Sequence, residues 1–115
     1  MKILIIEDDE LVQEMVARIL AREFDAPSIE FAASAPKAVA LLQHDGSYDL
    51  IVSDFNLKAG TGGDVLAWIR CERPTLVSRF IFFSSAMEPY TLHDKVIRKG
   101  FVGDLGKKIR ALLAE

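Results

Sequence analysis

Short runs of consecutive apolar residues, each ending in a polar or charged residue, recur along this chain of 115 residues. A run without polar alternation is typical of a β-strand that is covered on both faces, as strands in parallel sheets are. The runs are residues 3–6, 50–52, 80–83 and 96–97, and residues 28–32 form a weaker strand candidate that is interrupted by Glu30. They restrict the fold strongly, because two parallel strands can be joined only by a crossover segment.

Most segments between these runs have the apolar spacing of helices. A period near 3.6 runs from Leu11 to residue 20 and again through residues 38–42, 65–69 and 105–113. Ser34 is placed to cap the second of these helices. Because strands alternate with helices, the sequence predicts an α/β fold with a parallel sheet wrapped on both faces.

The segment between the fourth and fifth strands is an exception. Residues 86–94 carry Pro89 in their middle and lack a convincing apolar stripe. Proline inside a helix removes a hydrogen bond and clashes with the preceding turn. We therefore expect a loop or a single turn here, with the fourth helix reduced or absent.

Size and composition fit one domain that spans residues 1–115. Half of the residues are hydrophobic, 27% are charged and the formal net charge is -3, which excludes a disordered chain. No basic stretch indicates nucleic-acid binding, and no apolar run approaches the roughly 20 residues of a membrane span. Cys71 is the single cysteine and is interpreted as a structural or incidental thiol, so no internal disulfide is expected. The N-terminus has no signal-peptide pattern, and we expect a cytoplasmic protein.

Five polar residues follow the predicted strands directly. Glu7 and Asp8 end the first strand, Asp54 the third, Ser84 the fourth and Lys99 the fifth. The carboxyl ends of parallel strands lie along one edge of the sheet, where such folds bind ligands. If the strand order is 2-1-3-4-5, the first and third strands are neighbours, and the three carboxylates lie within several ångströms of one another.

Three adjacent carboxylates need a compensating cation. Two carboxylates about 4 Å apart repel by roughly 4 kcal/mol at an effective dielectric constant near 20. Oxygen ligands without histidine or cysteine favour a hard ion, Mg²⁺ or Mn²⁺, over zinc. Three carboxylates, one dication and the Lys99 ammonium sum to zero charge, which leaves room for a transient phosphoryl group.

The motifs at these strand ends resemble those of response-regulator receiver domains, the phosphoacceptor modules of bacterial two-component signalling. They are IIEDD in the first strand, IVSDFNL in the third, FFSSA in the fourth and RKGF after the fifth. Each is weak alone, but four in this order make a specific match over nearly the whole chain. The resemblance implies a single-domain, flavodoxin-like, doubly wound sheet of five parallel strands in the order 2-1-3-4-5.

The resemblance also implies which residues bind the metal and accept phosphate. Asp54 would accept a phosphoryl group from a histidine kinase or a histidine phosphotransfer protein. Asp8 and Asp54 would bind Mg²⁺ directly, Glu7 through water, and Asn56 through its backbone carbonyl. A carboxylate can attack phosphorus as a nucleophile while a metal orients a phosphoryl oxygen.

Two further residues complete the implied site. Lys99 would pair with the phosphoryl oxygens, and Ser84 would turn toward them and couple phosphorylation to a loop shift. Ser85 stands beside Ser84 and is the alternative source of that hydroxyl. The domain would catalyse only its own phosphorylation and dephosphorylation, so we do not expect an enzyme with a separate substrate.

The chain departs from the receiver pattern at several positions. Lys58 and Gly100 stand where the family usually has proline, and Val96 stands where it has an aromatic switch residue. A cis bond before a non-proline residue costs about 2.5 to 4 kcal/mol, so the Lys99–Gly100 bond is predicted to be trans. Lys58 is either a cation at the pocket mouth or an exposed loop lysine. Tyr90 is a candidate for the missing aromatic.

The remaining polar residues have simpler interpretations. Asp9 and Glu10 are read as charges that favour the start of the first helix. Lys95 is read as a solvated lysine at the start of the fifth strand. His44 and His93 are read as surface residues.

Four functions fit the sequence to different degrees. The leading one is a phosphorylatable receiver that changes its affinity for an unknown downstream protein. The alternative is a receiver-like interaction module that binds its partner whether phosphorylated or not, which the reduced fourth helix and Val96 favour. A flavodoxin-like cofactor binder is disfavoured because the acids after the first strand would repel its phosphate. A hydrolase with a nucleophilic Asp lacks an evident substrate pocket in so short a chain.

Overall fold

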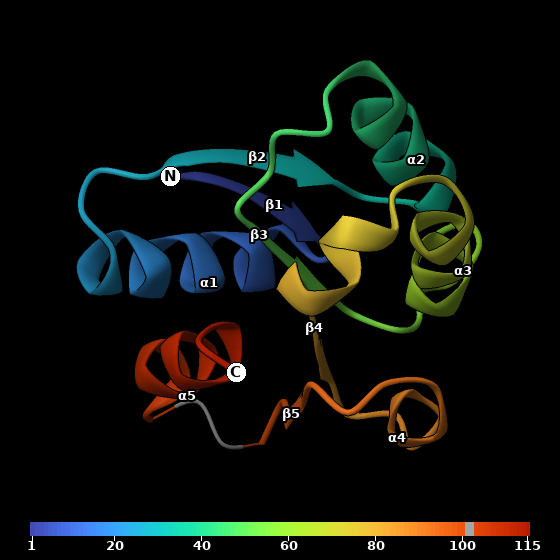
Figure 1. Ribbon diagram of the computed structural model, residues 1–115. Helices are drawn as coiled ribbons and strands as arrows, with labels where there is room; N and C mark the ends of the chain where they lie inside the picture. The colour runs from blue at the N-terminus through green and yellow to red at the C-terminus, as the bar shows by residue number, and fades with distance from the viewer. Residues whose placement is uncertain (101–102) are drawn as a thin grey trace.

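The computed structural model describes residues 1–100 and 103–115. Strands and helices alternate from the N-terminus to the C-terminus, as Figure 1 shows. The elements are β1 (Lys2–Ile6), α1 (Glu10–Glu23), β2 (Ser28–Ala32), α2 (Ala35–His44), β3 (Leu50–Ser53), α3 (Gly62–Glu72), η1 (Pro74–Arg79), β4 (Phe80–Ser84), α4 (Pro89–Leu92), β5 (Val96–Arg98) and α5 (Leu105–Leu113). Phe101, the last residue of the RKGF motif, lies outside the described residues.

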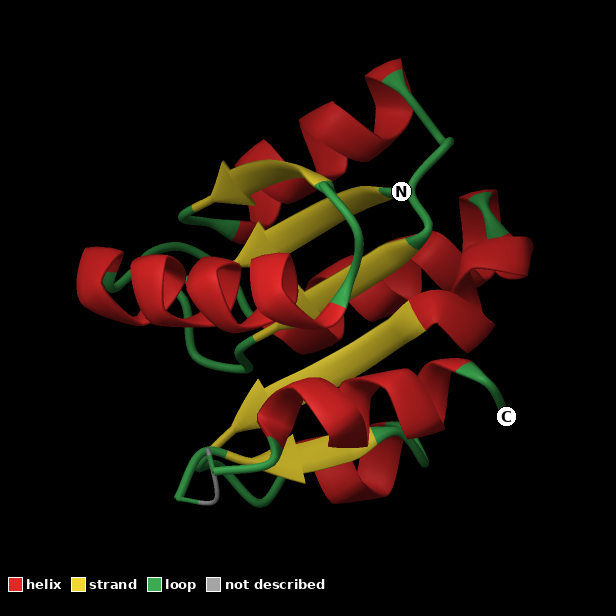
Figure 2. Ribbon diagram, turned by 90° about the vertical axis from the view of Figure 1, so that its left-hand side faces the viewer, coloured by secondary structure: helices red, strands yellow, loops and turns green. Residues whose placement is uncertain are grey.

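All four strand pairings in the described sheet are parallel, in the order β2-β1-β3-β4-β5. Helices α1 and α5 cover one face of this sheet, while α2 and α3 cover the other (Figures 1 and 2). The predicted flavodoxin-like fold and its strand order are therefore confirmed. The order makes β1 and β3 neighbours, with Ile6 paired to Ser53 at the last step of the ladder.

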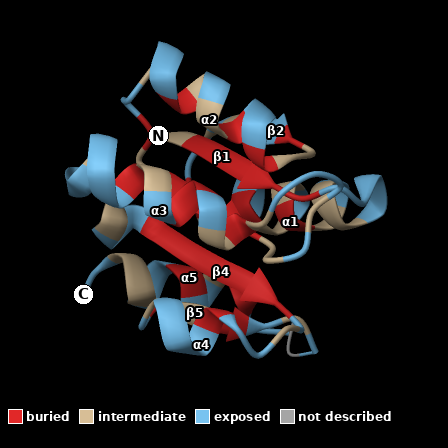
Figure 3. Ribbon diagram, turned by 90° about the vertical axis from the view of Figure 1, so that its right-hand side faces the viewer, coloured by how far each residue is buried: buried red, intermediate tan, exposed pale blue. Residues whose placement is uncertain are grey.

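Each face of the sheet carries its own apolar core. Alternate strand residues contribute to the two cores, so that Leu4 packs with α2 and α3 while Ile3 packs with α1 and α5. Figure 3 shows buried strands between helices whose outer faces are exposed. Burying one such aliphatic side chain fully contributes about 1.5 to 3 kcal/mol. The aliphatic runs of the sequence thus form the middle layer that fixes the strand ends.

Side-chain caps set the starts of three helices. Asp9 is the N-cap of α1, where its carboxylate accepts hydrogen bonds from two main-chain N–H groups. Ser34 caps α2 as predicted, and Thr61 forms a capping box with Asp64 at the start of α3. These caps satisfy N–H groups that a helix leaves unpaired. Glu10 is the first residue of α1, as its reading as a helix-start charge requires.

Helix α4 is a single turn of four residues, which confirms the predicted reduction. Arg70 of α3 donates a hydrogen bond to the carbonyl of Leu92 at 2.7 Å, and Pro89 is buried. The imidazole Nε2 of His93 lies 2.6 Å from the carbonyl oxygen of Phe80, and its side chain is 4% exposed. The prediction that His93 is a surface residue is therefore wrong, whereas His44 is exposed as expected.

Lys95 is also buried, contrary to its prediction as a solvated lysine. Its ammonium donates to the carbonyls of Ser78 at 2.8 Å and Leu112 at 2.7 Å, with Glu115 at 3.4 Å. Three main-chain acceptors replace the water that the charge would otherwise need. The charge also suits the negative end of α5.

Two smaller features differ from the sequence pattern. Leu11 was assigned to the apolar face of α1, but it lies in the first turn of that helix and is 77% exposed. Pro74 ends α3 as predicted, but the following residues form the short helix η1.

Among the described residues no peptide bond is cis, so the Lys99–Gly100 bond is trans as expected. No helix in the described ranges is both long and apolar enough to cross a membrane.

Candidate metal centre

The ends of β1 and β3 carry the acidic residues to one point at the edge of the sheet. The ladder continues one step past the strands, because the N–H of Glu7 donates to Ala32 and that of Asp54 donates to Ile6, both at 2.9 Å. These main-chain bonds hold both residues in extended backbone. Their side chains consequently lie side by side, as the parallel order of β1 and β3 predicts.

One carboxylate oxygen from each of Glu7, Asp8 and Asp54 lies within 4.8 Å of the other two. The side chains of Glu7 and Asp54 are 4% and 12% exposed, whereas Asp8 is exposed. The site therefore has a buried floor and one side open to water. An all-oxygen set of this kind suits a hard divalent ion that keeps part of its hydration shell.

Lys99 supplies positive charge to the floor of this cluster. Its Nζ lies 2.7 Å from Glu7 Oε1 and 2.9 Å from Asp54 Oδ2, while its main-chain N–H donates to Ser84 at 3.2 Å. Burial raises the pKa of Glu7 above its usual value, although the hydrogen bond from Lys99 opposes this. Burial alone would lower the pKa of Lys99, but its hydrogen bonds to Glu7 and Asp54 outweigh it and raise the pKa.

The residues around Asp54 hold its carboxylate and its backbone. The N–H of Phe55 donates to Asp54 Oδ1 at 2.7 Å, and the Ser53 hydroxyl donates to the Asp54 carbonyl at 2.7 Å. Helix α3 begins directly behind this carbonyl. A Cβ on Gly62 would lie 2.2 Å from the Asp54 carbonyl oxygen, so only glycine permits this approach.

The turn from β1 to α1 carries Glu7 and Asp8 and has side-chain supports of its own. The amide Nε2 of Gln13 donates to the Glu7 carbonyl at 2.6 Å, and the N–H of Asp9 donates to Glu7 Oε2 at 3.3 Å. Sequence reasoning did not identify Gln13. A polar residue in the first turn of an exposed helix gives no signal that its amide bonds back to the strand end.

The other predicted site residues lie in the loops around the cluster. Ser84 is buried, and its hydroxyl oxygen accepts from the N–H of Ala86 at 3.1 Å, whereas Ser85 is exposed. Asn56 is exposed and pairs through its backbone with Thr61. Their roles, like those of the carboxylates, stay predictions.

Lys58 and Tyr90 are both exposed. Val96, at the expected switch position, packs against the core on the α2 and α3 side.

These residues fit a divalent cation. In the described cluster three carboxylates face one ammonium, so two negative charges remain for a dication to balance. Oxygen donors, an open side and residual negative charge together favour Mg²⁺ or Mn²⁺.

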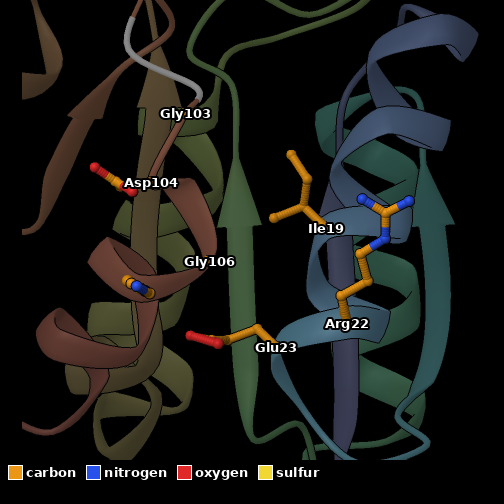
Figure 4. Close-up of a pocket in the computed structure, with 7 residues that line it drawn as sticks. Ile19, Arg22, Glu23, Gly103, Asp104 and Gly106 are labelled. Carbon is orange, nitrogen blue, oxygen red and sulfur yellow. The ribbon is translucent and has the colours of Figure 1, made fainter.

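A separate pocket of about 230 Å³ lies between α1 and α5 (Figure 4), and none of Glu7, Asp8 and Asp54 lines it. Gly106 lets the two helices approach, because a Cβ there would lie 3.1 Å from Glu23. Arg22 and Lys107 line it together with Glu23 and Asp104, so its charges balance. This pocket offers no cluster of metal-ligating groups and is not the candidate centre.

Comparison with known proteins agrees with this geometry. Residues 3–112 match the family model described as the response regulator receiver domain. None of the curated proteins compared with the chain matches it.

Solved structures match nearly the full length. The non-phosphorylated HemR receiver domain of Leptospira biflexa has a TM-score of 0.81 at 24% identity, covering 99% of this chain and 94% of that one. A CheY-like receiver protein of Methanospirillum hungatei has a TM-score of 0.80 at 25% identity, with coverage of 98% and 93%. The response regulator TrrA of Thermotoga maritima, solved in complex with Mg²⁺ and BeF, has a TM-score of 0.81 at 20% identity, with coverage of 96% and 97%.

Proposed function

Because the chain belongs to the response regulator receiver domain family, we propose that it accepts a phosphoryl group on Asp54 in a reaction that depends on Mg²⁺. The donor is a histidine kinase or a histidine phosphotransfer protein, and Mn²⁺ can replace Mg²⁺. The phosphorylated domain then changes its affinity for a downstream protein. It is a phosphoacceptor signalling domain of residues 1–115 and works in the cytoplasm, without binding nucleic acid or membrane.

The observation that carries this proposal is the shared contact of Lys99 with Glu7 and Asp54. It places a cation 2.9 Å from Asp54 Oδ2, while Oδ1 accepts a hydrogen bond from the Phe55 N–H. An anionic phosphoryl group brought to this oxygen therefore meets a positive charge. Such fixed charges stabilise the transferring group without reorganisation during the reaction.

In the proposed transfer, Asp54 Oδ2 attacks the phosphorus of a phosphohistidine. A P–O bond forms, the P–N bond breaks, and its electron pair stays on the imidazole nitrogen. Asp8, Asp54, Glu7 and the Asn56 carbonyl would hold the metal, which supplies charge for the phosphoryl oxygens when bound. Lys99 pairs with the transferred group.

Ser84 links the reaction to a change in shape. Its hydroxyl oxygen accepts a hydrogen bond from Ala86 in the β4–α4 turn. Rotation of this hydroxyl toward the phosphoryl group releases that bond and frees the turn.

The direct test is phosphorylation with acetyl phosphate and Mg²⁺, followed by intact-protein mass spectrometry. We expect the wild-type chain to gain one phosphoryl group and Asp54→Asn to gain none. Asp25→Asn is the matched control, because Asp25 is exposed in the loop after α1 and should leave labelling unchanged. Labelling of Asp54→Asn at the wild-type level would exclude Asp54 as the acceptor.

One observation favours a second candidate, the interaction module that does not depend on phosphorylation. The α4 turn is pinned by His93 to β4 and by Arg70 to α3, which restricts its movement. A partner bound equally with and without beryllofluoride, as measured by pull-down, would support this candidate over the first.

A further inference from the structure

We propose that Gln13 is a positioning residue for the acidic site. Its side-chain amide holds the carbonyl of the peptide unit that joins Glu7 to Asp8, and so fixes the direction in which Asp8 presents its carboxylate to a divalent cation. This inference rests on the proposed function, because it assigns a role to Gln13 in binding the same Mg²⁺ or Mn²⁺.

The hydrogen bond spans the point where the sheet ends and the turn begins. Gln13 Nε2 lies 2.6 Å from the Glu7 carbonyl oxygen in a part-buried position. One residue earlier, the Ile6 carbonyl accepts from the N–H of Asp54 in the neighbouring strand segment. The Glu7 carbonyl lies past this ladder, and a side chain from α1 occupies the place of a strand partner.

Fixing this carbonyl fixes the backbone that enters Asp8. The peptide bond is planar, so the orientation of the Glu7 carbonyl determines that of the Asp8 N–H as well. Gln13 is itself anchored, since its N–H donates to the Asp9 carbonyl at 2.9 Å in the first turn of α1. The two bonds close a short loop around Asp8.

Asp8 depends on its backbone more than the other two acids do. Glu7 and Asp54 are both held by Lys99, and Asp54 also accepts from Phe55. Within residues 1–100 and 103–115, no hydrogen bond or ion pair involves the Asp8 carboxylate, which is exposed. The direction of the Asp8 carboxylate relative to Glu7 and Asp54 is therefore set by the turn that Gln13 holds.

A purely structural role for Gln13 at the helix start predicts something different. Helix α1 already has a cap, because Asp9 Oδ1 accepts from Leu11 at 2.9 Å and from Val12 at 3.3 Å. The first N–H groups are thus satisfied without Gln13. Loss of the Gln13 amide should alter the turn and the cation affinity before it alters the fold.

The test compares Mn²⁺ binding by the whole chain in wild type and Gln13→Met, with free Mn²⁺ measured by electron paramagnetic resonance. Methionine has similar length and no N–H donor. We expect binding about tenfold weaker, the lower end of what loss of an outer-shell partner does to metal sites. Gln43→Met is the matched control, because Gln43 is exposed on α2 and should bind Mn²⁺ as the wild type does.

A second readout needs no metal. Amide hydrogen exchange of Asp9, whose N–H bonds to Glu7 Oε2, should be faster in Gln13→Met, while the amides of Val16 and Leu20 in α1 keep wild-type protection. Should Gln13→Met fail to fold, Gln13→Ala removes the same donor with a residue that favours helix, and the same two results are expected.

The outcomes separate this inference from the proposed function. If wild type fails to bind Mn²⁺ at millimolar concentrations, the proposed function fails. If wild type binds Mn²⁺ and Gln13→Met binds it equally well, only the role of Gln13 is overturned. A loss of affinity shared by Gln43→Met would overturn it too, because the effect would not be specific to the turn.

Discussion

At the scale of single residues, Lys99 is an internal counterion at the floor of the acidic cluster. Its ammonium contacts Glu7 and Asp54, two of the three carboxylates that would hold the metal. An arriving dication meets these carboxylates already paired. Lys99 would therefore oppose metal binding, even though it would favour the phosphoryl group in the proposed transfer.

This opposition gives a prediction for Lys99→Met. We expect Mg²⁺ to bind about fivefold more tightly, since a screened repulsion of about 1 kcal/mol between nearby charges corresponds to that factor. Phosphorylation by acetyl phosphate should be slower. Calorimetric titration measures the first effect and mass spectrometry the second.

Lys37→Met is the control for this prediction, because Lys37 is an exposed lysine of α2. Lys37→Met should change neither the affinity for Mg²⁺ nor the rate of phosphorylation by acetyl phosphate. Weaker Mg²⁺ binding by Lys99→Met would contradict the view that the lysine competes with the metal.

The residues that the sequence misassigned share one physical property. His93 and Lys95 are buried because carbonyls distant in the chain, on Phe80, Ser78 and Leu112, accept their hydrogen bonds. Gln13 was overlooked because its acceptor, the Glu7 carbonyl, lies across the turn between β1 and α1. Whether a polar side chain is buried depends on such tertiary acceptors, and no local pattern encodes them. The acids at the strand ends could be predicted, since parallel topology alone brings them together.

At the scale of elements, the shortened α4 is joined to the sheet through His93. Strand β5 pairs with Phe82–Ser84 only, so the Phe80 carbonyl lies beyond its end and takes the imidazole instead. Burial lowers the pKa of His93, although the bond to Phe80 opposes this. Arg70 and Lys95 disfavour the charged form further, while Asp94 favours it.

The lowered pKa of His93 predicts a loss of stability in weak acid. Below the ordinary value of about 6.5 the unfolded chain takes up this proton more readily than the folded one, so stability falls as the pH drops toward the folded pKa. One proton limits the slope to about 1.4 kcal/mol per pH unit. Urea unfolding between about pH 7.5 and about pH 5, which extends roughly one unit above and roughly 1.5 units below that value, measures the effect.

Two variants sharpen this measurement. His93→Gln keeps an amide donor for the Phe80 carbonyl but does not titrate. The difference between its pH dependence of stability and that of wild type is therefore the contribution of His93. His44→Gln removes the exposed histidine of α2 and should leave the wild-type profile in place. If the unfolding free energy of His93→Gln still falls with pH as that of wild type does, the acid sensitivity belongs to other groups.

The elements were predicted well where their periodicity was strong. Apolar runs predicted four of the strands, the weaker pattern of residues 28–32 predicted β2, and Pro89 correctly indicated that α4 is only a turn. Helix η1 was missed because Pro74 was read only as the end of α3, although proline also fits the first turn of a new helix. The prediction that Leu11 belongs to the apolar face of α1 was wrong, because helical periodicity does not show which turns of a helix pack against the sheet.

At the scale of the whole molecule, two lysines at opposite ends of β5 have different tasks. Lys99 lies among the carboxylates, whereas Lys95 ties together the start of β5, helix η1 and the end of α5 through main-chain carbonyls. Hydrogen bonds to charged groups contribute about 1.5 to 3 kcal/mol each. Lys95 therefore contributes to the stability of the domain and is not a residue of the acidic cluster.

We expect Lys95→Met to lower the free energy of unfolding by about 2 kcal/mol, because it removes the charged donor that these part-buried carbonyls share. Urea unfolding monitored by the fluorescence of Trp68 provides the measurement. Lys107→Met, at an exposed position of α5, should change stability little. An effect of Lys95→Met no larger than that of Lys107→Met would mean that water replaces the ammonium at these carbonyls.

The brevity of β5 also affects how copies of the domain meet one another. An outermost strand is a template on which a foreign strand can add through its free N–H and C=O groups, and a long, flat one invites polymerisation. At three residues, β5 presents a very short template on its side of the sheet. The short β5 thus disfavours edge-to-edge pairing on this side of the sheet.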